Sequence, residues 1–161
     1  MPLATIRPQI KALIESVAGV GVVHDYERYS ADPATVLAFF QTVEGQPLKG
    51  WFFKLARRDE FTKSNKRSLL VYTFDVSALY SVADAAATEK TFTDLIMAVC
   101  DKFRLLANVT LAGTCERTDT EAGPLAGRTG LQVDSIEYLR LSGTLVHFAR
   151  MKLAAQEFIT R

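Results

Sequence analysis

The sequence predicts a single α+β domain, residues 1–161, with two layers: a mostly antiparallel sheet and helices packed on one of its faces. Two patterns predict this class. Segments that alternate apolar and polar residues, as strands do, lie on both sides of a long segment with apolar residues every three or four positions, as in an amphipathic helix. Strands that are neighbours in the chain favour antiparallel pairing. A chain of 161 residues buries roughly 70% of the surface of its unfolded state.

The first elements are expected to be a helix, a strand and a short second helix. Apolar residues from Ile6 to Val17 recur at helical spacing, and a glycine shortly afterwards ends the helix. Residues 22–29 alternate, which predicts a strand with polar residues on both faces. Asp32 directly before Pro33 is typical of a helix N-terminus, so a short helix is expected to begin there.

The middle of the chain predicts two strands and the principal helix. Residues 51–56 alternate and predict a strand, whereas the polar residues 57–67 predict a loop. Residues 68–76 are rich in β-branched and aromatic residues and apolar on both faces, which predicts a central strand. After residues 83–88, the apolar positions of residues 92–106 follow a helical stripe, the strongest helix signal in the chain.

The last third predicts a long loop and a hairpin. Residues 113–130 are rich in Gly, Thr and Pro and predict a loop, preceded by a short strand near 109–111. Residues 131–141 and 145–153 alternate on either side of Ser-Gly-Thr at 142–144, which predicts a β-hairpin. The remaining residues either extend the last strand or fray.

The composition excludes several classes of protein. A net charge of +1 gives no overall field that demands nucleic acid or an acidic membrane as partner. No apolar run reaches the about 20 residues of a membrane-spanning helix, and the first residues predict an amphipathic helix instead of a secretion signal. Cys100 and Cys115 lack the spacing of a metal or redox motif, so free thiols in a reducing cytoplasm are expected.

The pattern of potential catalytic groups predicts no enzyme. His24 and Asp25 are adjacent on a predicted strand, so their side chains point to opposite faces and cannot form a dyad. A two-histidine site requires His147 to approach His24, and no ligand spacing supports it. Nucleophile and phosphate-binding motifs are missing. We therefore expect no catalytic residue, no cofactor and no metal; an enzyme would need a polar pocket that joins the two histidines.

The densest cluster of charge lies on and after the strand at 51–56. Six cations within fourteen residues are opposed only by Asp59 and Glu60. Two interpretations remain open: a solvated hairpin tip, or a surface that faces a partner or a lumen and meets DNA or an acidic protein. The six cations are Lys54, Arg57, Arg58, Lys63, Lys66 and Arg67.

Three segments together resemble a known family. The segments GVVHDYERY at 21–29, GWFFKLARR at 50–58 and DAAATEKTFTDLIMAVCDKF at 84–103 resemble phage and prophage tail-terminator proteins, relatives of the U-like minor tail protein of long-tailed phages. The resemblance spans about residues 5–150. Its motifs are structural patterns, and the family has no catalytic residues that carry over to this chain.

The resemblance implies an α+β fold and a role in virion assembly. Proteins of this family cap the growing tail tube as a ring, commonly a hexamer that closes in some cases only on the tube, and present the surface that joins the head. The implied partners are tail-tube and neck proteins and further copies of the chain, with DNA contact at most through a lumen. The implied location is the host cytoplasm during assembly and then the virion tail.

The polar residues of the strand at 22–29 are the candidate subunit seam. A head-to-tail ring needs two different complementary patches on each protomer, and His24, Asp25, Glu27 and Arg28 carry both signs of charge. The alternative to a tail protein is a small bacterial binding or adaptor domain of unknown ligand that uses the same kind of two-layer fold.

Overall fold

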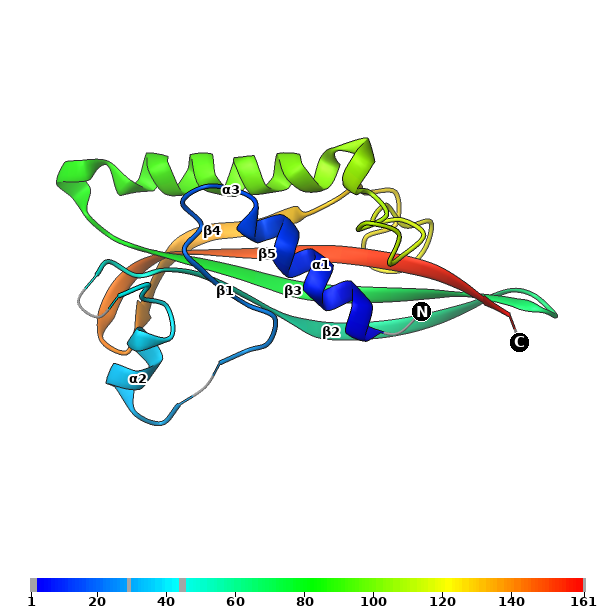
Figure 1. Ribbon diagram of the computed structural model, residues 1–161, viewed down its shortest axis with the longest axis horizontal. Coiled ribbons are helices and arrows are strands. Elements are labelled where there is room, and N and C mark those ends of the chain that lie inside the picture. The colour runs from blue at the N-terminus through cyan, green and yellow to red at the C-terminus, as the bar shows by residue number, and fades with distance from the viewer. Residues whose placement is uncertain (1–2, 29, 44–45, 161) are drawn as a thin grey trace.

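The computed structural model describes residues 3–28, 30–43 and 46–160, and it confirms the predicted α+β class (Figure 1). Five strands and three α-helices are found in these residues. The helices are α1 (Leu3–Glu15), α2 (Pro33–Ala38) and α3 (Thr88–Arg104), with 3-10 turns at Asp84–Ala86 and Leu106–Asn108. The strands are β1 (Val22–His24), β2 (Lys49–Ser64), β3 (Arg67–Ser81), β4 (Gln132–Leu141) and β5 (Thr144–Thr160).

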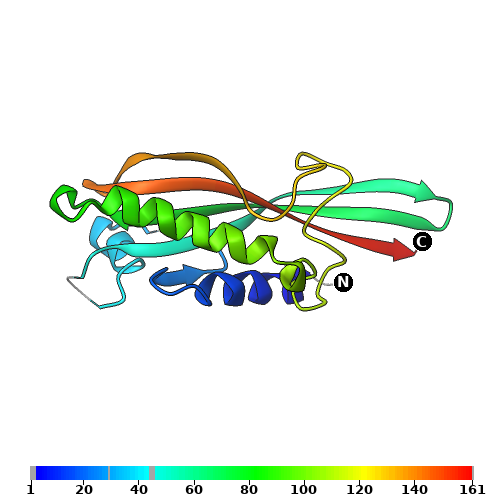
Figure 2. The same ribbon diagram turned by 90° about the horizontal axis from the view of Figure 1, so that it is seen from above.

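The strands form one sheet in the order β1-β2-β3-β5-β4. The short β1 is parallel to β2, and every other pair of neighbours is antiparallel. The three long strands β2, β3 and β5 run side by side through the length of the molecule (Figure 2). The last strand of the chain therefore lies inside the sheet, between β3 and β4.

The helices α1 and α3 cover one face of the sheet, called here the helix face. Alternate residues of β3, including Phe74 and Val76, point into this layer and pack with Ile10 of α1 and Phe92 and Ile96 of α3. Because strand side chains alternate, this face takes every second residue of the apolar β3. The predicted stripe of α3 is confirmed: its buried residues are Thr88, Phe92, Ile96, Val99 and Phe103.

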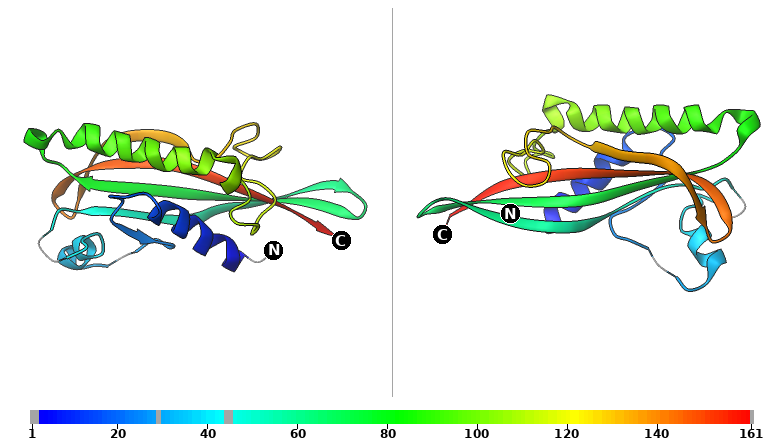
Figure 3. Two further views of the ribbon diagram at one scale, coloured as in Figure 1. Left: turned by 45° about the horizontal axis from the view of Figure 1, so that its top comes forward. Right: turned by 180° about the vertical axis from the view of Figure 1, so that it is seen from behind.

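The short helix α2 lies against the other face, called here the second face (Figure 3). Phe40, just after α2, packs with Leu79 and Phe148, whose neighbours in sequence point to the helix face. Phe40 also lies close against Gly50, where an added Cβ would meet its Cδ1 at 2.5 Å. Gly50 therefore lets the segment after α2 approach the sheet closely.

The predicted loop at 57–67 is wrong, because β2 and β3 continue as a hairpin to Ser64 and Arg67. Residues 57–62 and Ser64 pair with residues of β3, so the backbone ladder overrides the polar composition. With β5 alongside, residues 57–73 and 154–160 form a three-stranded extension, called here the arm. Figure 1 shows the arm reaching past the ends of α1 and α3.

Two other predicted strands differ from the structure. The strand expected at 22–29 ends at His24, since among the described residues of this stretch, 22–28, only Val22–His24 pair with Gly50–Phe52 of β2. Residue 29 lies outside the described residues. The strand expected near 109–111 is wrong, because Leu111 and Ala112 have positive φ angles of 47° and 54°. These residues begin a loop, 109–131, called here the edge loop.

The predicted hairpin of β4 and β5 is confirmed. Its turn is Ser142-Gly143, with φ angles of 48° and 85°, the positive values that a two-residue turn between twisted strands requires. Thr144 already pairs with Leu141. β5 then continues to Thr160, so the residues after 153 extend the strand instead of fraying.

Candidate functional site

His24 and Arg28 of the candidate seam hold the segment that follows α2. The Nε2 atom of His24 lies 2.7 Å from the carbonyl oxygen of Phe39, and the His24 ring meets Phe40 edge-on at 5.6 Å between centroids. The guanidinium of Arg28 lies 3.9 Å from the centroid of the Phe39 ring, a cation–π contact. Both side chains are half-buried within their own chain.

Asp25 and Glu27 lie outside β1, so the strand alternation expected for them does not apply. The carbonyl oxygen of Asp25 accepts a hydrogen bond from Nη1 of Arg7 at 2.6 Å, which ties the segment after β1 to α1. Glu27 instead reaches β2, where its Oε2 accepts a hydrogen bond from Nζ of Lys54 at 2.7 Å. One residue of the expected seam thus pairs with one of the six cations.

The two histidines lie on opposite faces of the sheet. His147 points to the helix face, where its Nε2 is 2.9 Å from Oγ1 of Thr88 and its ring stacks on Phe92 at 5.7 Å. Burial lowers the pKa of His147, against a weaker opposing effect of Glu89. His24 lies with Phe40 on the second face, so no pocket joins the pair. Among residues 3–28, 30–43 and 46–160, no group of three potential ligands is placed to hold a metal ion.

The six cations do not form one patch. On the arm, Arg57 and Arg58 pair with Thr73 and Tyr72 of β3, so their side chains leave opposite faces of the hairpin. Arg57 binds Asp59 at 2.7 Å, and Arg58 lies 3.8 Å from a carboxylate oxygen of Glu60. The basic cluster that the sequence suggested is therefore divided and largely neutralised by its own acidic residues.

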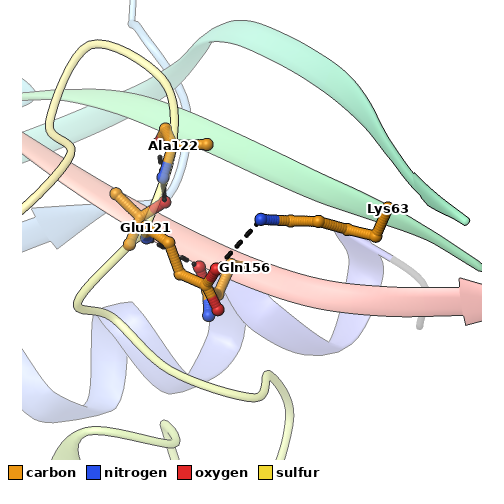
Figure 4. A network of polar contacts seen from close by, with 5 residues as sticks. Lys63, Glu121, Ala122 and Gln156 are labelled. Atoms are coloured by element: carbon orange, nitrogen blue, oxygen red, sulfur yellow. Dashed lines mark hydrogen bonds and ion pairs between the residues drawn. The ribbon is translucent and has the colours of Figure 1, made fainter.

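The remaining cations lie toward the end of the arm. Lys63 binds Oε2 of Glu121 at 2.9 Å, while the backbone N–H of Glu121 donates to Oε1 of Gln156 on β5 at 3.2 Å (Figure 4). Arg67 lies over the ring of Phe158 at 4.4 Å. Lys66 occupies the turn at the tip. Lys63 therefore anchors the edge loop to the arm.

A trough of about 450 Å³ opens in the middle of the second face. At one end the sheet is covered by the cluster around Phe40. At the other end Leu125 of the edge loop packs on Leu69 and Val71. Between these covers the sheet presents charged side chains flanked by two aromatic residues, Phe52 and Phe148.

The charges of the trough alternate in sign across the sheet. Lys54 is paired in register with Asp75, and Asp75 with Lys152. The row ends at Glu27, bound to Lys54 at 2.7 Å, and at Asp134, bound to Lys152 at 3.5 Å. This row of five residues is called here the charge ladder. Opposite charges on neighbouring strands stabilise a sheet, and they allow this face to stay open to water.

The charged groups of the ladder are engaged with one another. The hydrogen bond to Glu27, with a smaller contribution from Asp75, raises the pKa of Lys54, so its amine stays protonated and is not a nucleophile. Three carboxylates face two ammonium groups along the ladder. A third cation of the trough, Arg150, is bound to Glu137 at 3.1 Å. Because each of these cations is paired with a carboxylate, the trough does not favour a phosphate group or a nucleic-acid backbone.

Neither cysteine is poised for nucleophilic chemistry. Burial raises the pKa of the Cys100 thiol to about 11 and that of the Cys115 thiol to about 12. Both are free thiols, Cys115 being buried and Cys100 half-buried. Thiolate is the reactive form, so both side chains act as apolar packing groups at neutral pH.

A buried polar pair on the helix face was missed by the sequence analysis. The hydroxyl group of Tyr72 donates to Oε1 of Glu157 at 2.9 Å, and both side chains are buried. Burial and this hydrogen bond raise the pKa of Tyr72. One signal was present in the sequence: Glu157 falls at an apolar position of the alternation that includes Leu153 and Ala155.

A comparison of the sequence with models of known protein families finds no match, and a search of curated proteins finds none either. In the part of the chain that the structure describes, no helix combines the length and the apolar character needed to cross a membrane.

Proposed function

We propose that this chain is a structural protein of a phage or prophage tail, of the tail-terminator or completion type. It caps the tail tube and helps to form the head–tail junction without catalysis. Its partners are tail-tube and neck proteins and further copies of itself in a ring. The protein assembles in the host cytoplasm and remains in the virion tail. The resemblance of the segments at 21–29, 50–58 and 84–103 is the origin of this proposal.

The arm is the structural observation that supports it most. The outer part of the arm extends the sheet beyond α1 and α3 (Figure 1), whereas Leu70 and Tyr72 nearer its base pack in the layer of these helices. Much of the β2 side of the arm is exposed, whereas β3 in its centre is buried. A three-stranded extension of this kind is ordered by its own ladder and offers side chains to a neighbour over a long reach, which suits a subunit that must contact a tube.

The contacts of the candidate catalytic groups also support a structural role. His24 binds the backbone at Phe39 and His147 binds Thr88, so each histidine holds elements of the fold together. The two thiols are protonated at neutral pH. The cations of β2 pair with neighbouring carboxylates, which favours a protein partner over DNA as the main contact.

The experiment is a titration of the protein into its cognate tail-tube protein, with tube length followed by electron microscopy and mass by light scattering. We expect growth to stop, with this protein as a ring at one end. A variant with Lys66→Glu and Arg67→Glu at the tip of the arm is expected to cap less well than the control Lys90→Glu, an exposed lysine of α3. Unchanged tube length over a tenfold excess of the wild-type protein would refute the proposal.

The trough favours a second candidate, a small bacterial binding or adaptor domain. Its 450 Å³ and its mixture of the charge ladder with Phe52 and Phe148 suit a polar protein segment. Capture of such a segment that is lost with Phe148→Ala, in a protein that leaves tail tubes unchanged, would favour this candidate over the first.

A further inference from the structure

Two edges of the sheet are open, and they differ in sequence. At one edge, β1 pairs only with Gly50–Phe52 of β2. From residue 53 to residue 64, no strand among the described residues pairs with the outer side of β2. At the other edge, the outer side of β4 pairs with no described strand. Unpaired N–H and C=O groups along such edges are templates for another chain.

The chain closes a third stretch of edge but leaves these two open. Beyond the pair of Gln132 and Lys152, where β4 begins, the edge of β5 is covered by the edge loop. The N–H of Glu116 donates to the carbonyl oxygen of Gln156, and the N–H of Gln156 donates to the carbonyl oxygen of Arg117, both at 2.9 Å. Natural sheets commonly protect their edges in this way. Among the described residues, no loop makes backbone hydrogen bonds of this kind to β4 or to residues 53–64 of β2.

The two open edges run in opposite directions. Because β2 is antiparallel to β3, β3 to β5 and β5 to β4, β4 is antiparallel to β2. A second copy with the same face of its sheet outward, shifted along the strands so that residues 53–64 of its β2 lie level with β4, therefore brings this open edge against β4 in an antiparallel arrangement. The joined sheets then continue with an unbroken alternation of direction.

The charge counted along the two strands differs in sign, although most of these groups are ion-paired within the subunit. Residues 53–64 contain four basic and two acidic residues, a net charge of +2, whereas β4 contains two acidic residues and one basic residue, a net charge of −1. Pairing of β2 with β2 would bring two positive edges together, which is unfavourable. The β4 edge also carries exposed apolar side chains: Ile136 is 38% exposed, Tyr138 59% and, on the adjoining strand, Leu145 43%.

We propose that the edge of β4 in one copy pairs with residues 53–64 of β2 in the next copy, so that the sheet continues from subunit to subunit. The contact joins two different patches, and a head-to-tail contact of this kind generates a ring or an open chain. This inference rests on the proposed function, for which it names the subunit seam. It places the seam on the two open edges, while His24 and Arg28 support α2 within each subunit.

The direct test is cross-linking between two single variants. One variant carries Arg140→Cys on β4, and the other carries Ala56→Cys or Thr62→Cys on β2; all three positions are exposed. A flexible bis-maleimide is added to each variant alone, to the mixture and to the wild-type protein. The wild type is the control for Cys100 and Cys115, whose raised pKa values make them slow to react.

Head-to-tail pairing predicts a cross-linked dimer in the mixture and little in either variant alone. A dimer from the Arg140→Cys variant alone would show that β4 pairs with β4, which overturns the proposal. The reaction is run on the free protein at high concentration and on the protein bound to tail tubes. If the mixture yields no dimer in either state, the proposal is also overturned.

A second test breaks the seam without a cross-linker. The double variant Ile136→Lys, Tyr138→Lys is expected to lower the self-association measured by sedimentation at least tenfold in equilibrium constant. The matched control is Leu106→Lys, which changes a side chain that is 88% exposed and lies in the 3-10 turn after α3, outside both strands. Equal association of the two variants, with native circular dichroism spectra for both, would contradict the proposal.

The terminator function and the β2–β4 seam can be refuted independently. If the protein stops tube growth but the β2–β4 cross-link does not form, the terminator function stands and the seam lies elsewhere. If the cross-link forms but tubes grow unchanged, the chain assembles through its sheet edges in another role.

Discussion

Tyr72 on β3 and Glu157 on β5 are joined by a hydrogen bond of 2.9 Å beneath the helix layer. Both side chains belong to the face that packs on α1 and α3, and both are buried. A carboxyl group at this depth is costly unless it is hydrogen-bonded. The pair therefore links the two central strands where the arm meets the body of the molecule.

Replacing Tyr72 by Phe removes this hydrogen bond and keeps the ring. We expect the free energy of unfolding to fall by about 1–3 kcal/mol, since a hydrogen bond to a charged group is lost and a buried carboxyl oxygen loses a partner. Urea denaturation followed by circular dichroism measures the change. Tyr138→Phe, at a side chain that is 59% exposed, is the control, and equal stability of the two variants would contradict the role assigned to the pair.

Phe92 tests the packing of α3 on the sheet. It is buried between α3 and β5, where its ring lies on His147. Phe92→Ala is expected to cost about 3–5 kcal/mol through lost burial and the cavity left behind. Met97→Ala on the exposed side of the same helix is expected to cost far less. Chemical denaturation of both variants decides, and a loss below about 1 kcal/mol for Phe92→Ala would mean that the helix is not packed as described.

His147 makes stability depend on pH. Its pKa is lowered from the ordinary 6.5 because burial disfavours the charged ring, so the folded protein binds fewer protons at this site than the unfolded chain. The contribution of His147 is complete above the ordinary pKa and is lost as the pH falls through it toward the lowered folded value. Between about pH 7.5 and about pH 5, the wild type should lose more stability than His147→Phe does. The free energy of unfolding is measured by urea denaturation at each pH. An equal loss in both proteins as the pH falls would exclude this effect.

Asp75 occupies the centre of the charge ladder. Asp75→Lys places like charges opposite both Lys54 and Lys152, and we expect a loss of about 1 kcal/mol or more at low salt. The loss should shrink as salt screens these exposed charges. Asp75→Asn, which removes the negative charge without adding a positive one, should show a smaller loss. Thermal unfolding of the wild type and the two variants at low and high salt measures these losses of stability. A loss that is independent of salt would point to packing instead.

The sequence predicted the elements whose periodicity agrees with their burial. The stripe of α3 and the alternation on both sides of Ser142-Gly143 each follow from which side chains are buried, so pattern and structure coincide. The outer half of β2 could not be found in this way. Its residues from 57 to 64 are mostly polar because the β2 side of the arm is largely open to water, and only their pairing with β3 makes them a strand.

The candidate site residues were also predicted only in part, because their contacts depend on how distant segments pair. Charge counted along the sequence suggested a cluster, but the hairpin divides Arg57 and Arg58 between two faces. A strand of eight residues was expected at 22–29, but the chain leaves the sheet after His24, which sends Glu27 to Lys54 on the second face. Contacts between residues distant in sequence, such as Lys63 with Glu121, carry no local signal.

The position of β5 between β3 and β4 has a consequence for synthesis of the chain. β2 and β3 leave the ribosome as a hairpin, and the edge of β3 that faces away from β2 stays without its partner strand until residues 144–160 are made. Such long-range pairing is slow to form and leaves apolar strand surface exposed in the meantime. The nascent protein is therefore most in need of a chaperone during translation of its last third, and slower decoding there would lengthen its exposure to aggregation.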